Sequence, residues 1–238
     1  METKLLSDHA EDLLEAAELL RNGAVVGMPT ETVYGLAADA RNPEAVRQIF
    51  AAKGRPADNP LIVHIAEMRA LEQVAATVPP LAEKLAERFW PGPLTMILPK
   101  RKEIPEITSG GLDTVGIRMP SHPVARALIQ LSGVPIAAPS ANISGYPSPT
   151  TAQHVMRDMQ GKIAAVVDGG ACSVGVESTV IALEPNGTVR ILRPGFVTKE
   201  MLEEVALEVT LDPAILHQLQ EGQTVRSPGM KYQHYSPR

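Results

Sequence analysis

Short apolar runs that end abruptly in small polar residues recur along this chain, and they restrict the folds open to it. The run Val134 to Ala138 has the length of a buried strand and ends in Pro139-Ser140-Ala141-Asn142-Ile143-Ser144-Gly145, after which Thr150 restarts a helical pattern. Hydroxyl and amide side chains at a strand end lie at the edge of a sheet, where α/β proteins usually hold small ligands. The alternative is an ordinary strand-to-helix loop, because Ser and Asn are common loop residues.

Helical patterns separate the apolar runs. Helices are predicted over Asp8 to Asn22, Asn42-Pro43 to Lys53-Gly54, Met68 to Ala76, Pro80 to Phe89, Pro123 to Ser132, Thr151 to Gln160, Thr198 to Val209 and Asp212 to Gln220. In the first, Asp8 and Glu11 have the spacing of a capping box. In the second, Asn42 is the expected cap and Pro43 the first helical residue.

The remaining apolar runs predict strands. These are Ala24 to Met28, Leu61 to Ile65, Leu94 to Leu98, Thr114 to Met119, Ala164 to Val167, Ser178 to Leu183 and Thr188 to Leu192. The Asn186-Gly187 pair between the last two is typical of a hairpin turn. Irregular alternation of helices and strands with at least one hairpin indicates an α/β fold with a mixed sheet.

Composition excludes several classes of function. A net charge of −5 argues against broad, sequence-independent binding of nucleic acid, and the run Lys100-Arg101-Lys102 is interpreted as a solvated face. The single cysteine, Cys172, forms no internal disulfide, and the sequence lacks a zinc-ligand cluster.

Neither a membrane-length apolar run nor a signal peptide is present, which favours a cytoplasmic protein. The glycine loops that bind nucleotides and the Gly-x-Ser-x-Gly elbow are also missing, so scattered side chains must hold any nucleotide.

Four polar loops carry the candidate site residues: Thr30 to Tyr34, Lys53 to Asn59, Ser140 to Ser148 and Gly175 to Thr179. If they converge, the cleft holds Lys53, Arg55, Ser140 and Asn142, a combination of cations and neutral donors that suits phosphate oxygens. For Lys53 the alternative is a cation at a helix C-terminus, where it interacts favourably with the helix dipole.

Two charged or titratable residues lie inside apolar strands. His64, between Val63 and Ile65, is more often a packed residue than a catalyst in such a position. Arg118 needs an anionic partner, which is either a structural carboxylate or the carboxylate of a ligand. Glu177-Ser178-Thr179 is either a turn before a strand or a set of ligand hydroxyls.

Several segments, taken together, resemble the YrdC-like family of threonylcarbamoyl-AMP synthases. The matching motifs are Pro29-Thr30-Glu31-Thr32-Val33-Tyr34-Gly35-Leu36, Lys53-Gly54-Arg55-Pro56 with Asn59-Pro60-Leu61, Trp90-Pro91-Gly92-Pro93-Leu94-Thr95, Pro139-Ser140-Ala141-Asn142 and Ser227-Pro228-Gly229-Met230-Lys231-Tyr232. The resemblance spans about Gly23 to Arg238 and depends on the order and number of the motifs.

The resemblance implies a twisted α/β sheet with flanking helices and a large concave, positively charged face. It implies a nucleotidyltransferase that converts L-threonine, bicarbonate and ATP, with Mg²⁺ as the companion of ATP, into threonylcarbamoyl-AMP and pyrophosphate. The product supplies the threonylcarbamoyladenosine (t6A) modification of tRNA through a downstream transferase complex. Residues 1–209 are expected to form the catalytic domain and residues 210–238 a linker and lid, with the second, C-terminal domain of longer members absent.

The resemblance also assigns residues. The family's Lys-x-Arg and Ser-x-Asn tetrad corresponds to Lys53, Arg55, Ser140 and Asn142, which would hold the phosphates and carry catalysis. Further ATP contacts correspond to Asn59, Thr114, Ser148, Arg193 and Tyr235, and the threonine pocket to Thr32, His64, Arg118 and Ser178. On this basis Lys53 and Arg55 neutralise phosphate charge, and Arg118 pairs with the threonine carboxylate. The metal ligands stay open.

Two other functions remain. One is a binding module that uses a basic concavity for RNA, although 3% aromatic residues and a net charge of −5 leave only weak tRNA binding. The other is a different carbamoyl transferase in which a related domain is part of a larger protein with zinc-finger cysteines, which this chain lacks.

Overall fold

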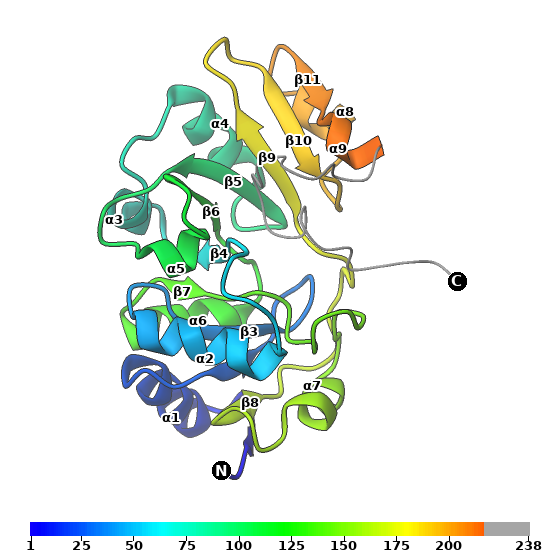
Figure 1. The fold of residues 1–238 in the computed structure, drawn as a ribbon. Coiled ribbons are helices and arrows are strands. Elements are labelled where there is room, and N and C mark those ends of the chain that lie inside the picture. The colour runs from blue at the N-terminus through cyan, green and yellow to red at the C-terminus, as the bar shows by residue number, and fades with distance from the viewer. Residues whose placement is uncertain (217–238) are drawn as a thin grey trace.

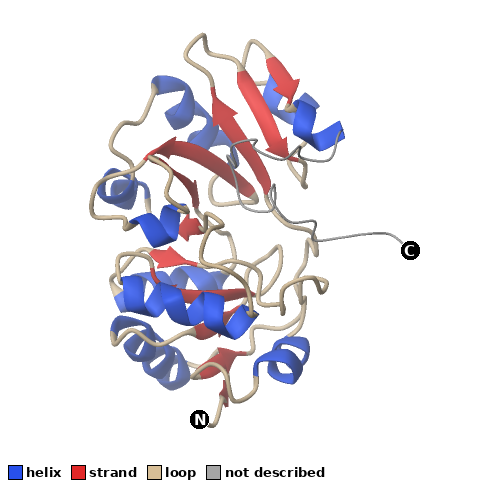
Figure 2. Cartoon of the chain, viewed as in Figure 1, coloured by secondary structure: helices blue, strands red, loops and turns tan. Residues whose placement is uncertain are grey.

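The computed structural model describes residues 1–216, which form a mixed sheet flanked by helices (Figures 1 and 2). Its strands are β1 (Lys4–Leu6), β2 (Val26–Met28), β3 (Gly35–Asp39), β4 (Ile62–His64), β5 (Leu94–Pro99), β6 (Thr114–Arg118), β7 (Ile136–Ala137), β8 (Ala165–Val167), β9 (Thr179–Leu183), β10 (Val189–Arg193) and β11 (Val209–Leu211). Its helices are α1 (Ala10–Arg21), α2 (Pro43–Lys53), η1 (Met68–Ala70), α3 (Leu71–Val74), α4 (Pro80–Phe89), α5 (Glu106–Ser109), α6 (Pro123–Ser132), α7 (Ala152–Met159), α8 (Lys199–Glu203) and α9 (Pro213–Leu216).

The order of the strands is β1-β8-β2-β3-β7-β4-β6-β5-β9-β10-β11. The sheet contains both parallel pairs, such as β4 with β6, and antiparallel pairs, such as β5 with β6. The predicted hairpin is present as β9 and β10, and its turn is closed by a bond from the Thr188 N–H to Asn186 Oδ1. The predicted α/β fold with a twisted mixed sheet is therefore confirmed.

Helices cover the two faces of the sheet unequally. Strand residues alternate between faces, so Leu36 and Ala38 of β3 join the larger core while Ala37 joins a second core. The larger core includes side chains of α2, α3, α4 and α7, and the second is built on α1 and α6. Beyond the second core, strands β4, β9 and β10 contribute only a small cluster of Ile62, Val180, Ala182 and Leu192. Because few apolar side chains cover this part of the sheet, polar side chains can lie on it.

Helix α2 follows the sequence prediction closely. The Asn42 side chain accepts from the N–H groups of Glu44 and Ala45, and Pro43 is the first helical residue. The helix ends where Gly54 adopts a left-handed conformation with φ 66°, a region that favours glycine. This boundary places Lys53 in the last turn of the helix and Arg55 in the loop after it.

Several element predictions differ from the structure. The capping box of α1 is absent: His9 is the N-cap without a side-chain bond, and Asp12 instead accepts from the N–H and hydroxyl of Ser7, each at 2.7 Å. The helix predicted over 68–76 is split into η1 and α3, and the one over 198–209 ends at Glu203. Strands β1, β3 and β11 and helix α5 were not predicted. Because β11 pairs with β10 across the boundary set at residue 209, the sheet continues beyond it.

Candidate active site

A pocket lies on the sparsely covered face of the sheet, between strand ends and loops. Its lining combines Thr30, Thr32, Val33, Gly35, Arg55, Asn59, Leu61, Ile62, His64, Arg118, Ala138, Pro139, Ser140, Glu177, Ser178 and Arg193. Eight of the predicted site residues are in this set: Thr32, Arg55, Asn59, His64, Arg118, Ser140, Ser178 and Arg193. Five of them, Thr32, Arg55, Asn59, Ser140 and Ser178, come from the four polar loops, so these loops converge at the pocket as expected.

The floor of the pocket follows from strand register. In the sheet, His64 of β4 lies opposite Arg118 of β6, and Arg118 lies opposite Thr95 of β5. Residues paired across neighbouring strands point to the same face. Ser178, just before β9, continues this row because its hydroxyl lies 2.8 Å from that of Thr95. One polar row thus crosses β4, β6 and β5 and reaches the start of β9.

Arg118 is buried and its carboxylate partner within the protein is Glu31. The two side chains form an ion pair between Arg118 Nη2 and Glu31 Oε1, both almost fully buried. Arg118 also donates from Nη1 to Thr32 Oγ1 at 2.9 Å and from Nε to the Gly92 carbonyl at 3.3 Å. Of the two partners that the sequence left open, the structure contains the structural carboxylate.

The hydroxyl of Thr32 has its proton committed. Thr30 Oγ1 donates to the Val33 carbonyl at 2.6 Å, so the 2.9 Å bond between the two threonine hydroxyls must use the proton of Thr32. One lone pair of Thr32 accepts from Arg118. Toward the pocket Thr32 therefore offers a remaining acceptor position, which suits an N–H or O–H of a ligand.

His64 is buried, and its Nδ1 lies 3.2 Å from the Ile62 carbonyl. Burial and the nearby charge of Arg118 lower the pKa of His64 to about 3, so the imidazole is neutral at physiological pH. The carbonyls of Ile136 and Ile62 both interact with the ring, so the single N–H of the neutral imidazole is used within the protein. His64 is therefore a packed residue, as expected for its position in an apolar strand, and it also lines the pocket.

Lys53 lies directly behind the pocket lining, not in it. Its side chain is fully buried, and Nζ donates to the carbonyls of Ser140 and Asn142 and to Asn142 Oδ1 at 3.4 Å. Burial and the charge of Arg55 lower the pKa of Lys53 to about 7. The ammonium group therefore holds the loop after β7 from behind.

The side chains of Ser140 and Asn142 are bonded to one another. Asn142 Nδ2 donates to the carbonyls of Ile143 and Tyr146 at 2.9 and 2.8 Å, which fixes Oδ1 as the acceptor of the Ser140 hydroxyl at 2.5 Å. Ser140 lines the pocket, whereas Asn142 is fully buried behind it. In this arrangement neither side chain has a free proton for a phosphate, contrary to the donor role expected from the sequence.

Arg55 and Asn59 form the side of the pocket that follows α2. The Arg55 guanidinium lies over the Phe50 ring, 5.5 Å from its centroid. Asn59 is fully buried, and within residues 1–216 neither its Nδ2 nor its Oδ1 has a hydrogen-bond partner. Buried amides are rarely left unsatisfied in native proteins, so this side chain points to a ligand with both a donor and an acceptor, or to two ligand groups.

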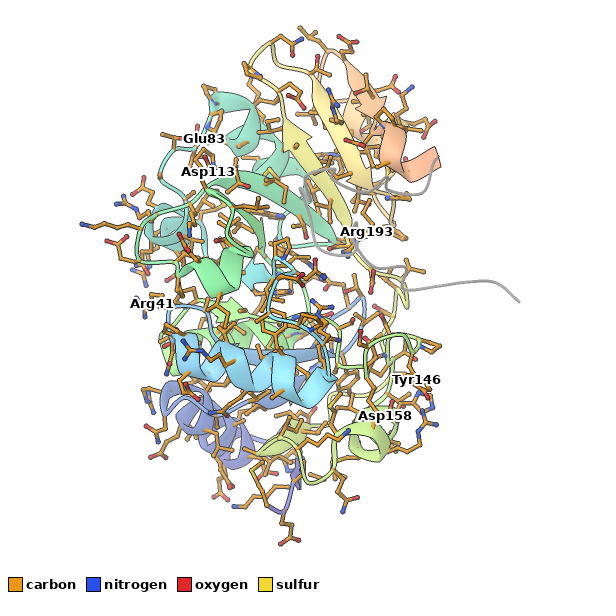
Figure 3. All side chains as sticks on the ribbon, in the orientation of Figure 1. Arg41, Glu83, Asp113, Tyr146, Asp158 and Arg193 are labelled. Atoms are coloured by element: carbon orange, nitrogen blue, oxygen red, sulfur yellow. The ribbon has the colours of Figure 1, made fainter. Side chains whose placement is uncertain are left out.

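Arg193, at the end of β10, holds the start of β9 (Figure 3). It donates to the Ser178 carbonyl from Nε and Nη2 at 3.1 and 2.9 Å, and to the Ser178 hydroxyl at 3.1 Å. Its Nη1 lies 3.2 Å from Glu177 Oε2, while Ser148 donates to Glu177 Oε1 at 2.8 Å. Ser148 thus supports the pocket through Glu177.

One expected ATP contact, Thr114, lies away from the pocket. Thr114 begins β6, whereas Arg118 ends it, so the two Cα atoms are roughly 13 Å apart along the strand. In the basic run, Lys100 Nζ donates to the Ile104 carbonyl and the Ser109 hydroxyl, and Arg101 donates to the Glu72 carbonyl. These two cations therefore stabilise their own surroundings. Tyr235 and the predicted lid, Tyr232 to Tyr235, lie outside the described residues.

Sequence reasoning missed Glu31 and Glu177, the carboxylate partners of Arg118 and Arg193. The signal available for Glu31 was its charge, because the rest of the segment Pro29 to Leu36 is apolar or carries hydroxyl groups.

Among residues 1–216 no helix is long and apolar enough to cross a membrane. In the same part of the chain, no three His, Cys, Asp or Glu side chains gather where they could hold a metal ion.

Known proteins share this sequence and fold. A family model for Sua5, YciO and YrdC proteins, described as "Telomere recombination", matches residues 18–195. A relative from Pyrococcus abyssi (strain GE5 / Orsay) named threonylcarbamoyl-AMP synthase is 54% identical over 93% of this chain and 64% of its own length. One of the same name from Bacillus subtilis (strain 168) is 52% identical over 99% of this chain and 67% of its own. The crystal structure of P. abyssi Sua5 complexed with L-threonine gives a TM-score of 0.93 at 50% identity, over 100% of this chain and 69% of that one. The chain thus spans about two thirds of the length of these proteins.

The expectation that the second domain is absent is wrong. A model described as "Threonylcarbamoyl-AMP synthase, C-terminal domain" matches residues 197–238. Within that range β11 pairs with β10, and α8 packs against β11. The segment matched by this model therefore begins inside the sheet-forming part of the chain. The matches to the two family models and to the two synthases together show that the chain belongs to the Sua5/YciO/YrdC family.

Proposed function

We propose that the protein synthesises threonylcarbamoyl-AMP from L-threonine, bicarbonate and MgATP, releasing pyrophosphate. The observation that carries the proposal is one pocket in which a buried arginine and neutral acceptors lie beside a second group of cations. The relative whose structure contains L-threonine supports the same substrate here.

The threonine end of the pocket is the row of Thr32, His64, Arg118 and Ser178. Arg118 would pair with the carboxylate of threonine through the donors that its protein partners leave unused. The acceptor position of Thr32 and the neutral ring of His64 would receive N–H or O–H groups of the substrate. An amino acid presents both kinds of group on one carbon atom.

The ATP end is formed by Arg55, Asn59, Ser140 and Arg193. Arg55 would neutralise phosphate charge, and the unsatisfied amide of Asn59 would bond to ATP. Lys53 and Asn142 would act from behind by fixing the loop that carries Ser140. Direct ATP contacts by Thr114, Ser148 and Tyr235 remain predictions. Magnesium would arrive on the phosphates of ATP as part of the substrate.

The chemistry requires positioning more than covalent help. The amine of threonine and bicarbonate form a carbamate with loss of water. A carbamate oxygen then attacks the α-phosphorus in line, and the bond from that phosphorus to the oxygen of pyrophosphate breaks. Water must be excluded because the carbamate decomposes and the product is a reactive mixed anhydride. The segment Tyr232 to Tyr235 would supply the lid, and a chain cut after Gln223 that retained full synthesis would contradict that role.

The product would pass in the cytoplasm to a transferase that modifies tRNA. The test is pyrophosphate release with threonine, bicarbonate and ATP, omitting each in turn. Release that requires all three supports the proposal, and release without threonine refutes it. Salt-dependent tRNA binding without any pyrophosphate release would favour an RNA-binding module instead.

A further inference from the structure

We infer that Glu31 is a positioning residue for the amino acid substrate: it orients and neutralises Arg118 so that this arginine presents one N–H from each terminal nitrogen to a carboxylate. The inference rests on the proposed function, because it concerns the threonine end of the same pocket. Glu31 acts through Arg118, not by contact with the substrate.

Both oxygens of Glu31 are already used within the protein. Oε1 pairs with Arg118 Nη2, while Oε2 accepts from the backbone N–H of Ser121 at 2.7 Å and from its hydroxyl at 2.6 Å. Ser121 lies in the segment between β6 and α6, just beyond Arg118 in the chain. The carboxylate is therefore fixed against the same strand end that carries Arg118.

The donor count of Arg118 shows what this arrangement leaves over. A guanidinium has five N–H groups. Three are used: Nε to Gly92, Nη1 to Thr32 and Nη2 to Glu31. The two that remain belong to different terminal nitrogens, and Arg118 lines the pocket. Such a pair of N–H groups matches the two oxygens of a carboxylate.

Glu31 also keeps a buried charge compensated. Burial disfavours its ionised form, but the Arg118 charge and the two bonds from Ser121 outweigh burial and lower the pKa of Glu31 below its ordinary value. The pair therefore stays charged at neutral pH. Without Glu31, the Gly92 carbonyl and the Thr32 hydroxyl would be the remaining acceptors of Arg118, and its Nη2 would be free to turn away from its present position.

The experiment compares Glu31→Gln with wild type in steady-state pyrophosphate release. Glutamine keeps the size but loses the charge, and one end of it would face N–H donors. We expect KM for threonine to rise about tenfold or more while KM for ATP changes less than about threefold. The mirror control is Glu177→Gln, which removes the carboxylate beside Arg193 and is expected to affect KM for ATP more than KM for threonine.

A second readout separates positioning from general damage to the fold. Wild type should prefer L-threonine over L-threoninol, which lacks the carboxylate, and Glu31→Gln should lose most of that preference. Equal loss for both ligands, or equal increases in both KM values, would overturn the inference. If Glu31→Gln does not fold, Ser121→Ala removes only one bond to Glu31 and should raise KM for threonine about two- to fivefold; an unchanged value would count against positioning.

Measuring threonine binding directly tests the role of Glu31 separately from the proposed synthase activity. Calorimetry measures the threonine affinity of wild type and Glu31→Gln in the absence of ATP. If wild type binds threonine and the variant binds it equally well, Glu31 has no positioning role, whatever the activity. If wild type releases no threonine-dependent pyrophosphate, the proposed function fails, while a tenfold difference in binding would still support the role of Glu31.

Discussion

The buried ammonium group of Lys53 should make both ATP affinity and protein stability depend on pH, in opposite directions. Its Nζ holds the loop after β7 through the carbonyls of Ser140 and Asn142, and its pKa is lowered to about 7 by burial and by Arg55. Raising the pH from 6 to 9 therefore removes the charge that ties this loop to α2. The matched variant is Lys53→Met, which has a similar length and no proton to lose.

Affinity for ATP should fall as the pH rises. Below about pH 7 the amine is charged and the loop is held. One pH unit above the pKa only about a tenth of the molecules retain the charge, so the Kd of MgATP should increase about tenfold for each further unit, or about 1.4 kcal/mol. The charge-assisted bonds at stake are each worth about 1.5–3 kcal/mol, which is sufficient for that slope.

Stability should change in the other direction. The folded pKa of about 7 lies below the value of 10.5 for an unperturbed lysine, so between these values the unfolded chain binds more protons than the folded one. The free energy of unfolding should therefore rise with pH across that interval, by up to about 5 kcal/mol in total. Below pH 7 both states are protonated, and Lys53 contributes no slope.

Calorimetric titration with MgATP, without threonine, at pH 6.5, 7.5 and 8.5 measures the first effect, and urea unfolding in the same buffers measures the second. Other titrating groups act equally in wild type and in Lys53→Met, so the difference between the two proteins isolates Lys53. The variant should bind ATP weakly at every pH. A wild-type Kd that stays constant, or a variant whose Kd follows that of wild type, would refute the reasoning.

Three further predictions concern single side chains. Thr32→Val should raise KM for threonine about tenfold, because Arg118 loses an acceptor, whereas Thr32→Ser should stay near wild type in the same kinetics. Arg193→Lys should raise KM for ATP about tenfold, since an ammonium group cannot reproduce the fork that binds the Ser178 carbonyl twice; unchanged kinetics would argue against this clamp. Asn42→Ala should lower the free energy of unfolding by about 1 kcal/mol with unchanged KM values, as measured by urea denaturation and pyrophosphate release, because only the cap of α2 is lost.

Local signals were sufficient for the elements that carry the site. Asn42, Pro43 and Gly54 mark both ends of α2, so the position of Arg55 in the following loop could be predicted from the sequence. Polar residues at strand ends identified the loops that meet at the pocket, because strand ends on one side of a sheet lie near one another.

Long-range partners could not be predicted in the same way. Glu31 and Arg118 are 87 residues apart, and nothing local to either one specifies the other. The side chain of Lys53 could have turned to the pocket or to the loop behind it, and only the packed structure decides between them. Strand β3 was overlooked because Gly35-Leu36-Ala37-Ala38-Asp39 has little β-branched or aromatic character; pairing with β2 and β7 makes it a strand.

The pairing of β1 with β8 has a consequence for synthesis of the protein on the ribosome. Lys4 pairs with Ala165, and the Thr3 hydroxyl donates to the carbonyl of Ile163, 160 residues further along the chain. At about 5–20 residues per second, the first strand waits roughly 10 to 30 seconds before its partner is translated. During that interval β2 and β3, which are close in sequence, can already pair. The N-terminal strand therefore stays without its partner while β2 to β7 are translated, and a ribosome that pauses before residue 165 leaves it exposed.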